Sequence, residues 1–276
     1  IPFYPLEKDH LSPLEEFLYE KYRLGIDDIA SPEDYPPSMQ ALAKRYPEVG
    51  ENFCAFLRRM KPTKPRESSY LSEGMDLSVY THLRYLPKPI HFHQFFEILF
   101  VAEGHCENIV KQTALSLRKG DVCFLAPGTP HQNQVFNHET IVYNILGRTS
   151  TFQSTFSELY GQNDIISSFF TKNLYKRNAD TSPYILCRTD NEPIFLELIR
   201  KMIDEVQGRR VFAGGYMNLL FKAFIIELLR RHEQHFTVGV ATDNVETENI
   251  TAILRYIQNN YQTLTLTETA RFFSYS

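Results

Sequence analysis

The sequence has no tryptophan and only four cysteines among its 276 residues. Cys54, Cys106, Cys123 and Cys187 stand far apart, and none of them forms the C-x-x-C spacing of a structural metal site. So few cysteines in a chain of this length exclude a small disulfide scaffold. They favour reduced thiols in a cytoplasmic protein.

Long apolar runs and an excess of positive charge are also missing. Glu97 interrupts the apolar stretch at 95–101, and Lys222 and Glu227 interrupt the stretch at 219–229, so no run has the length that spans a membrane. The formal net charge is −4. A domain dedicated to nucleic-acid binding is usually basic, so any DNA-binding surface must be confined to a local region or lie outside this chain.

Helical signals dominate the first 60 residues, beginning with the segment Ser12-Pro13-Leu14-Glu15. Ser12 is suited to the N-cap, proline to the first helical position and an acid to the third. Ser31-Pro32-Glu33-Asp34 repeats this pattern, which predicts a second helix. The basic, proline-containing residues 61–66 then indicate a linker.

From about residue 70 the apolar residues alternate with polar ones, which is typical of strands. Residues 77–85 show the pattern most clearly. Glycine and proline at Gly104, Gly120 and Pro127-Gly128 separate further strand-like segments. Several short strands at this spacing predict a sandwich or a barrel. The further segments are 95–101, 107–111, 114–117, 121–125 and 140–146.

After Gly147 the period becomes helical again. Residues 195–206 carry apolar side chains at i, i+3, i+4, i+7, i+8 and i+11, the pattern of an amphipathic helix. Residues 216–229 are apolar nearly all round, which predicts a helix that is buried on more than one side. Packing between a barrel and a partner subunit satisfies this, and packing inside one chain satisfies it equally. The polar residues 235–245 indicate a linker.

Within the strand region, His91, His93, Glu97 and Gly104 form the pattern H-x-H-x3-E-x6-G. On an extended chain, positions 91, 93, 95 and 97 point to the same face. Two imidazoles and one carboxylate on a shared face are suitable ligands for a divalent transition metal. His131, which follows a turn, completes the set if it enters the same cavity.

These residues resemble the cupin barrel. The first cupin motif matches fully, whereas in the second motif Gly120, Gly128 and His131 fit but the proline comes one residue late. The expected asparagine is also displaced, with Asn133 nearby. The resemblance implies a pocket for a small effector, with a divalent transition metal as an alternative occupant. The metal ligands would be His91, His93, Glu97 and His131, and the effector pocket would add Phe95 and Tyr143 to those four.

The last 27 residues, 250–276, resemble the start of the DNA-binding domain of the AraC/XylS transcription regulators. Thr265-Leu266-Thr267-Glu268 is a capping box that opens a helix. The resemblance implies that the sequence stops inside the first helix-turn-helix, before the recognition helix that reads bases. These residues are therefore expected to bind DNA weakly or not at all by themselves. The packing residues of this domain would be Ile253, Ile257, Thr265, Glu268, Ala270 and Phe273.

Together the patterns and the resemblance predict an α+β protein similar to the AraC/XylS regulators. The resemblance implies that a cupin-like antiparallel β-barrel senses a small effector and that a homodimer presents DNA-binding domains to DNA in the full-length protein. In the family, paired helices make the dimer, which implies Leu198, Met202, Leu220 and Phe224 as interface residues. A metal-dependent cupin enzyme, a dioxygenase or isomerase, is the alternative, although an enzyme has no use for residues 250–276. The predicted parts are a helical extension with a linker at 1–66, the barrel at 67–150, dimerisation-type helices at 151–235, a linker at 236–247 and the helix-turn-helix domain at 248–276.

Overall fold

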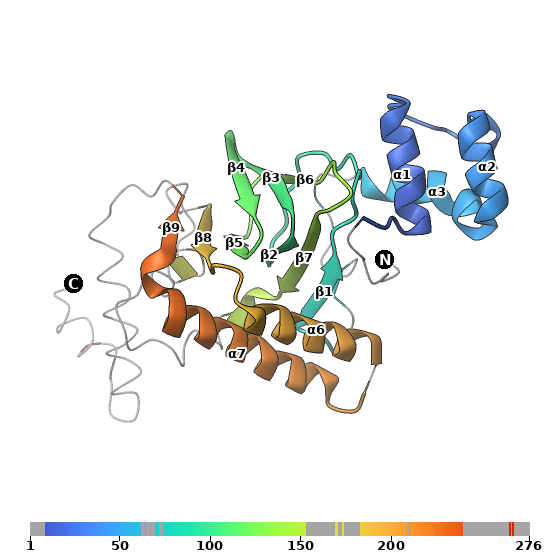
Figure 1. Cartoon of the computed structure of the whole chain (residues 1–276). Coiled ribbons are helices and arrows are strands. Elements are labelled where there is room, and N and C mark those ends of the chain that lie inside the picture. The colour runs from blue at the N-terminus through green and yellow to red at the C-terminus, as the bar shows by residue number, and fades with distance from the viewer. Residues whose placement is uncertain are drawn as a thin grey trace.

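The computed structural model describes residues 9–61, 64, 70–71, 74–152, 169–170, 173, 183–208, 210–239, 265 and 267. Two antiparallel sheets form the centre of the protein, a module of short helices lies beside one end of them, and two long helices lie against the larger sheet (Figure 1). The predicted α+β class is confirmed.

Within the described residues, the larger sheet has six strands in the order β1-β7-β2-β5-β8-β9, and the smaller sheet has three in the order β4-β3-β6. Neighbouring strands all pair antiparallel. The strands are β1 Leu77–Thr81, β2 Phe96–Glu103, β3 His105–Val110, β4 Thr113–Arg118, β5 Asp121–Leu125, β6 His131–Gln134, β7 Ile141–Gly147, β8 Tyr184–Arg188 and β9 Phe236–Val238.

Strand β2 is apolar at nearly every position because both of its faces are covered. Ile98 and Phe100 pack toward the long helices, whereas Leu99 and Val101 pack into a second core between the two sheets. Successive side chains of a strand point to opposite faces, so a central strand contributes to two cores at once. Glu97 interrupts this apolar pattern on the face between the sheets.

Gly104 joins β2 to β3 in a backbone conformation with φ +71°. A Cβ atom at this position would lie 2.3 Å from the Thr140 hydroxyl oxygen and 2.8 Å from the Thr140 Cα. The motif glycine is therefore required both by the turn and by the close approach of the neighbouring loop.

Two long helices, α6 (Pro193–Gly208) and α7 (Ala213–His232), cover the outer face of the larger sheet (Figure 1). Leu198, Met202, Leu220 and Phe224 are at most 7% exposed and belong to the core that these helices share with the sheet. Their assignment to a dimer interface is corrected, because they face the chain's own strands. A helical apolar pattern reports a buried face but does not identify what covers it.

The sheet also includes strands outside the predicted barrel at 67–150. β8 pairs with β5, and β9 pairs with β8, so residues from the predicted helical region and the predicted linker extend the larger sheet. Both strands are short, and β9 has only three residues, which is too few for a detectable alternation.

No helix among the described residues is long and apolar enough to cross a membrane.

The N-terminal module contains α1 (Pro13–Arg23), α2 (Pro37–Arg45) and α3 (Pro47–Met60). The predicted capping box at Ser12 and Glu15 is present. The second predicted cap opens only a short 3₁₀ turn, Pro32–Asp34, and α2 follows it. The module has an apolar core of its own.

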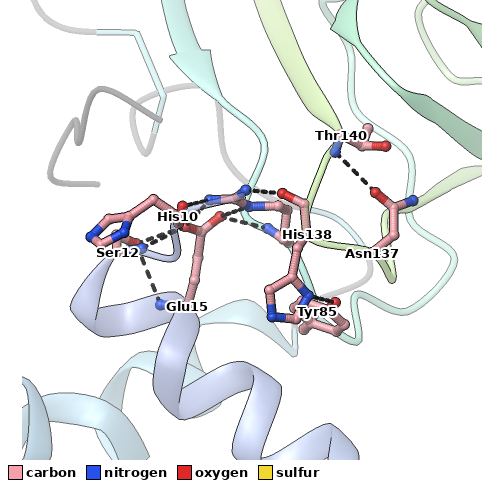
Figure 2. A network of polar contacts seen from close by, with 8 residues as sticks. His10, Ser12, Glu15, Tyr85, Asn137, His138 and Thr140 are labelled. Carbon is pink, nitrogen blue, oxygen red and sulfur yellow. Dashed lines mark hydrogen bonds and ion pairs between the residues drawn. The ribbon is translucent and has the colours of Figure 1, made fainter. Parts of the chain in front are cut away.

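A buried ion pair joins this module to the sheets (Figure 2). The side chains of Arg84 and Glu15 are each 0% exposed, and Arg84 Nη2 lies 2.9 Å from Glu15 Oε2. The guanidinium also donates to the backbone carbonyls of His10 and His138. Arg84 lies in the predicted strand 77–85, but β1 ends at Thr81. Beyond it the chain turns toward the module, where Leu83, Tyr85 and Leu86 join the helical core.

Candidate ligand-binding and metal-binding site

Four polar side chains converge between the two sheets: His91, His93, Glu97 and His131. Each is at most 3% exposed, and their ligand atoms all lie within 4.8 Å of one another. Glu97 lies on β2 of the larger sheet, and His131 begins β6 of the smaller one. A backbone bridge between His91 and His131, with N–O distances of 3.0 and 2.9 Å, brings the two motifs together. The predicted convergence of the four residues is therefore observed.

All three histidines are oriented by the same kind of backbone contact. Nδ1 lies 3.1 Å from the Pro89 carbonyl in His91, 2.8 Å from the Phe95 carbonyl in His93 and 2.9 Å from the Thr129 carbonyl in His131. A carbonyl oxygen only accepts, so each Nδ1 carries the proton. In a neutral ring this leaves the lone pair on Nε2, the atom available to bind a metal or a ligand.

The contacts of Glu97 need a positive charge. Its Oε2 lies 2.7 Å from His93 Nε2 and 3.1 Å from His131 Nε2. If both rings are neutral, two nitrogen lone pairs face a carboxylate oxygen, which is repulsive. The arrangement is favourable when Nε2 is protonated or when a cation lies among these atoms. His91 Nε2 is buried and has no hydrogen-bond partner among the described residues.

Burial and hydrogen bonding set the protonation of two members of the cluster. Burial raises the pKa of Glu97, but the hydrogen bonds and charges of His131 and His93 together outweigh it and hold this pKa well below its usual range. Burial, with the charge of Lys88, lowers the pKa of His91 to about 3. Near neutral pH, Glu97 is therefore a carboxylate and His91 a neutral imidazole, the forms that bind metals.

Three asparagines extend the polar region between the sheets. Asn144 on β7 donates to Glu97 Oε1 at 2.6 Å and to the Tyr80 hydroxyl at 3.0 Å. Asn108 on β3 and Asn133 on β6 face each other in the strand register and are 0% and 4% exposed. Neither amide has a hydrogen-bond partner among the described residues. Buried polar groups are normally paired, so these amides indicate that a ligand or ordered water belongs here.

The two aromatic residues predicted for the pocket lie in different places. Phe95 stacks on His93 with ring centroids 3.9 Å apart and an interplanar angle of 2°. Tyr143 packs on the opposite face of β7, in the core shared with α6 and α7. The structure therefore brings Phe95 to the cluster and does not bring Tyr143 there. Asn144, the next residue, takes the inward position.

Sequence reasoning missed Asn108 and Asn144, although a signal for Asn144 exists. It is the one polar residue in the segment Ile-Val-Tyr-Asn-Ile-Leu of β7.

Five of the residues predicted for the DNA-binding domain lie outside the described residues. Of that set only Thr265 is described, and it is exposed.

Comparison with known proteins agrees with this geometry. Residues 80–154 match the model of the AraC-like ligand-binding domain. This segment is an AraC-like ligand-binding domain. It contains all four converging residues, from His91 to His131. The AraC/XylS resemblance seen in the sequence is thus confirmed for the part of the chain that holds the site.

The solved structures to which this chain is similar include regulators and a cupin. Apo ToxT from Vibrio cholerae strain SCE256, in a variant with one lysine replaced by alanine, is 12% identical, covers 74% of this chain and 72% of its own, and has a TM-score of 0.39. The AraC-like transcriptional activator CuxR is 12% identical over 72% of this chain and 64% of its own, with a TM-score of 0.33. A Cupin 2 conserved barrel domain protein from Salinispora arenicola CNS-205 is 18% identical. The match covers 31% of this chain and 87% of that protein, with a TM-score of 0.22. No curated protein matches the sequence significantly.

Proposed function

We propose that this chain is the effector-sensing part of a bacterial transcription regulator of the AraC/XylS type. The observation that carries the proposal is the position of the buried polar cluster. It lies inside the AraC-like ligand-binding domain, and several of its polar atoms have no partner among the described residues. A protein site that leaves buried polar groups unpaired is preorganised for a ligand that pairs them.

The same cluster is suited to a divalent transition metal. Three imidazole nitrogens and one carboxylate oxygen form the donor set, and backbone carbonyls hold each ring in the ligating tautomer. His91, His93, Glu97 and His131 would hold the ion. A bound divalent cation would neutralise Glu97 and would offer a coordination position to an effector.

The sheet supplies a route from the pocket to the helices. Glu97 and Asn144 face the site, while their neighbours Ile98 and Tyr143 belong to the core shared with α6 and α7. A ligand that binds one arrangement of these strands more tightly than another shifts the packing of the helices by that difference in affinity. DNA binding is assigned to residues 248–276 and to the full-length protein.

We assign the homodimer contact to the outward face of α7 instead of the buried residues considered above. Its apolar side chains include Tyr216, Leu219 and Ile226, which are 45%, 63% and 37% exposed. Their spacing of three and seven residues places them on one stripe of the helix. In sedimentation velocity, Leu219→Lys is expected to give a monomer where the unmodified protein gives a dimer. Thr237→Lys, at an exposed position of β9, serves as the control.

A metal-dependent cupin enzyme is the second candidate, and the three-histidine, one-carboxylate set is the observation that favours it. Native mass spectrometry with elemental analysis of the purified protein separates the two. An organic mass bound once per chain, without metal, supports the sensor. One transition metal per chain, lost in His91→Ala and His131→Ala but kept in the exposed control His105→Ala, supports the metal site. An unliganded, metal-free protein that takes up neither zinc nor any small molecule contradicts the proposal.

A further inference from the structure

Two further histidines meet at the end of α7, outside the cluster between the sheets (Figure 1). His232 is the last residue of the helix, and His235 directly precedes β9. Their Nδ1 atoms lie 3.3 Å apart. His232 is 4% exposed, and its ring centroid lies 5.7 Å from that of Phe195 on α6, whereas His235 is exposed. The pair therefore combines one imidazole that is fixed by packing with one that solvent reaches.

Glu192 determines where the buried ring of His232 carries its proton. His232 Nε2 lies 3.0 Å from Glu192 Oε1, and Arg231 Nη1 lies 2.8 Å from the other carboxylate oxygen. A carboxylate accepts hydrogen bonds and does not donate them, so Nε2 carries the proton. In a neutral ring the lone pair is then on Nδ1, the atom that faces His235. A carboxylate that orients a histidine in this way is the usual outer partner of a metal-binding imidazole.

The backbone holds both sides of this histidine pair. Glu192 follows a turn in which Asp190 and Asn191 have φ angles of 50° and 61°. The turn packs closely against Gly120, where a Cβ atom would lie 2.5 Å from the Asn191 backbone nitrogen. On the other side, the strand that follows His235 is β9, which pairs with β8. The carboxylate and the second imidazole are therefore positioned by the same end of the larger sheet.

The distance between the two Nδ1 atoms suits two ligands of one metal ion. Two nitrogens that bind one zinc ion at about 2.0–2.1 Å with a tetrahedral angle lie roughly 3.3–3.4 Å apart. A hydrogen bond from an N–H group is usually shorter, about 2.9–3.0 Å. Neutral imidazoles bind zinc, copper and nickel, whereas calcium and magnesium prefer oxygen ligands. Both the spacing and the type of ligand atom therefore favour a divalent transition metal.

We propose that His232 and His235 bind a divalent transition metal through their Nδ1 atoms, with Glu192 as the outer partner of His232 and water in the remaining positions. The site shares no residue with the cluster between the sheets, so it is independent of the proposed sensor function. A bound ion joins the end of α7 to the start of β9. It thereby stabilises the junction between the long helices and the edge of the larger sheet.

Isothermal titration calorimetry of the full chain with zinc chloride tests this assignment. The unmodified protein is expected to bind one zinc ion per chain more than His235→Ala, whatever the cluster between the sheets binds. Because His235 is exposed, His235→Ala should unfold at the same temperature as the unmodified protein in the absence of metal. The matched control is His105→Ala, which removes an exposed histidine 3.8 Å from the Glu139 carboxylate and should leave the number of bound zinc ions unchanged.

Glu192→Gln tests the role of the outer carboxylate and should weaken zinc binding at this site by roughly tenfold or more. Calcium chloride should not bind here, because both ligand atoms are nitrogens. Three results would overturn the assignment. They are the same number of zinc ions in His235→Ala and the unmodified protein, an equal loss of zinc in His105→Ala, and an unchanged zinc affinity in Glu192→Gln.

Discussion

Two buried polar clusters lie on either side of the short segment that follows β1, and they differ in how their charges are paired. Arg84 and Glu15 are both fully buried, and the guanidinium donates to the Glu15 carboxylate and to two carbonyls (Figure 2). On the other side, Lys88 has no ion pair or hydrogen bond to its ammonium, and His91 Nε2, Asn108 and Asn133 have no hydrogen-bond partners among the described residues.

The difference separates a structural network from a binding site. A buried charge that is completely paired fixes the position of the elements that carry it. Buried polar groups that lack partners destabilise the fold, and they are retained where a ligand pairs them. The first cluster therefore fastens the N-terminal module to the sheets, and the second prepares a pocket. The predictions below test this contrast.

The largest effect is expected from Glu15→Ala, which leaves Arg84 buried without its carboxylate. Removing one partner of a buried ion pair costs about 3–5 kcal/mol. Urea unfolding should show this loss. The control is Glu16→Ala on the same helix. Glu16 Oε2 forms an ion pair with Arg45 Nη1 at 3.6 Å, and the Arg45 side chain is 68% exposed. That exposed pair is expected to contribute less than about 1 kcal/mol. Equal losses would contradict a structural role for the Arg84 network.

A pH-dependent effect is expected from His82, whose pKa is lowered to about 4 by burial and by the charge of Lys88. The unfolded chain binds a proton there near pH 6.5 and the folded chain does not, so stability falls as pH decreases from about 6.5 to 4. His82→Gln should reduce the slope of unfolding free energy against pH in this window by about 1.4 kcal/mol per unit.

His105→Gln is the matched control for that slope, since the His105 side chain is 66% exposed. Its slope should equal that of the unmodified protein. A slope that is the same in His82→Gln and the unmodified protein would show that His82 is accessible to protons in the folded state.

The smallest effect is expected at Asn108, where an apolar residue should stabilise the ligand-free protein. Both amide atoms are buried and have no hydrogen-bond partner in the part of the chain that the structure describes, and replacing such a group recovers about 1–2 kcal/mol of desolvation cost. Asn108→Val should therefore unfold at higher urea concentration. Asn144→Val provides the comparison and should be less stable than the unmodified protein, because Asn144 is paired with Glu97 and Tyr80.

Sequence patterns predicted those helices and strands that are determined by residues close together in the sequence. The capping box at Ser12 and Glu15 opens α1, and the apolar, strand-like segment 95–101 corresponds to β2. Elements without a local pattern were missed, such as the three-residue β9. The predicted strand 77–85 ends early at Thr81, because Arg84 is drawn to a carboxylate that lies 69 residues earlier in the chain.

For the site, the sequence by itself determined the motif residues His91, His93, Glu97 and His131, since their spacing and strand parity were readable. Only the tertiary structure decided which side chains join them. It placed Asn144 inward and Tyr143 outward, brought Lys88 and His82 to one cavity, and buried Leu198 and Phe224 inside the chain. The physical reason is that periodicity specifies which residues share a face, whereas packing between distant segments determines what that face meets.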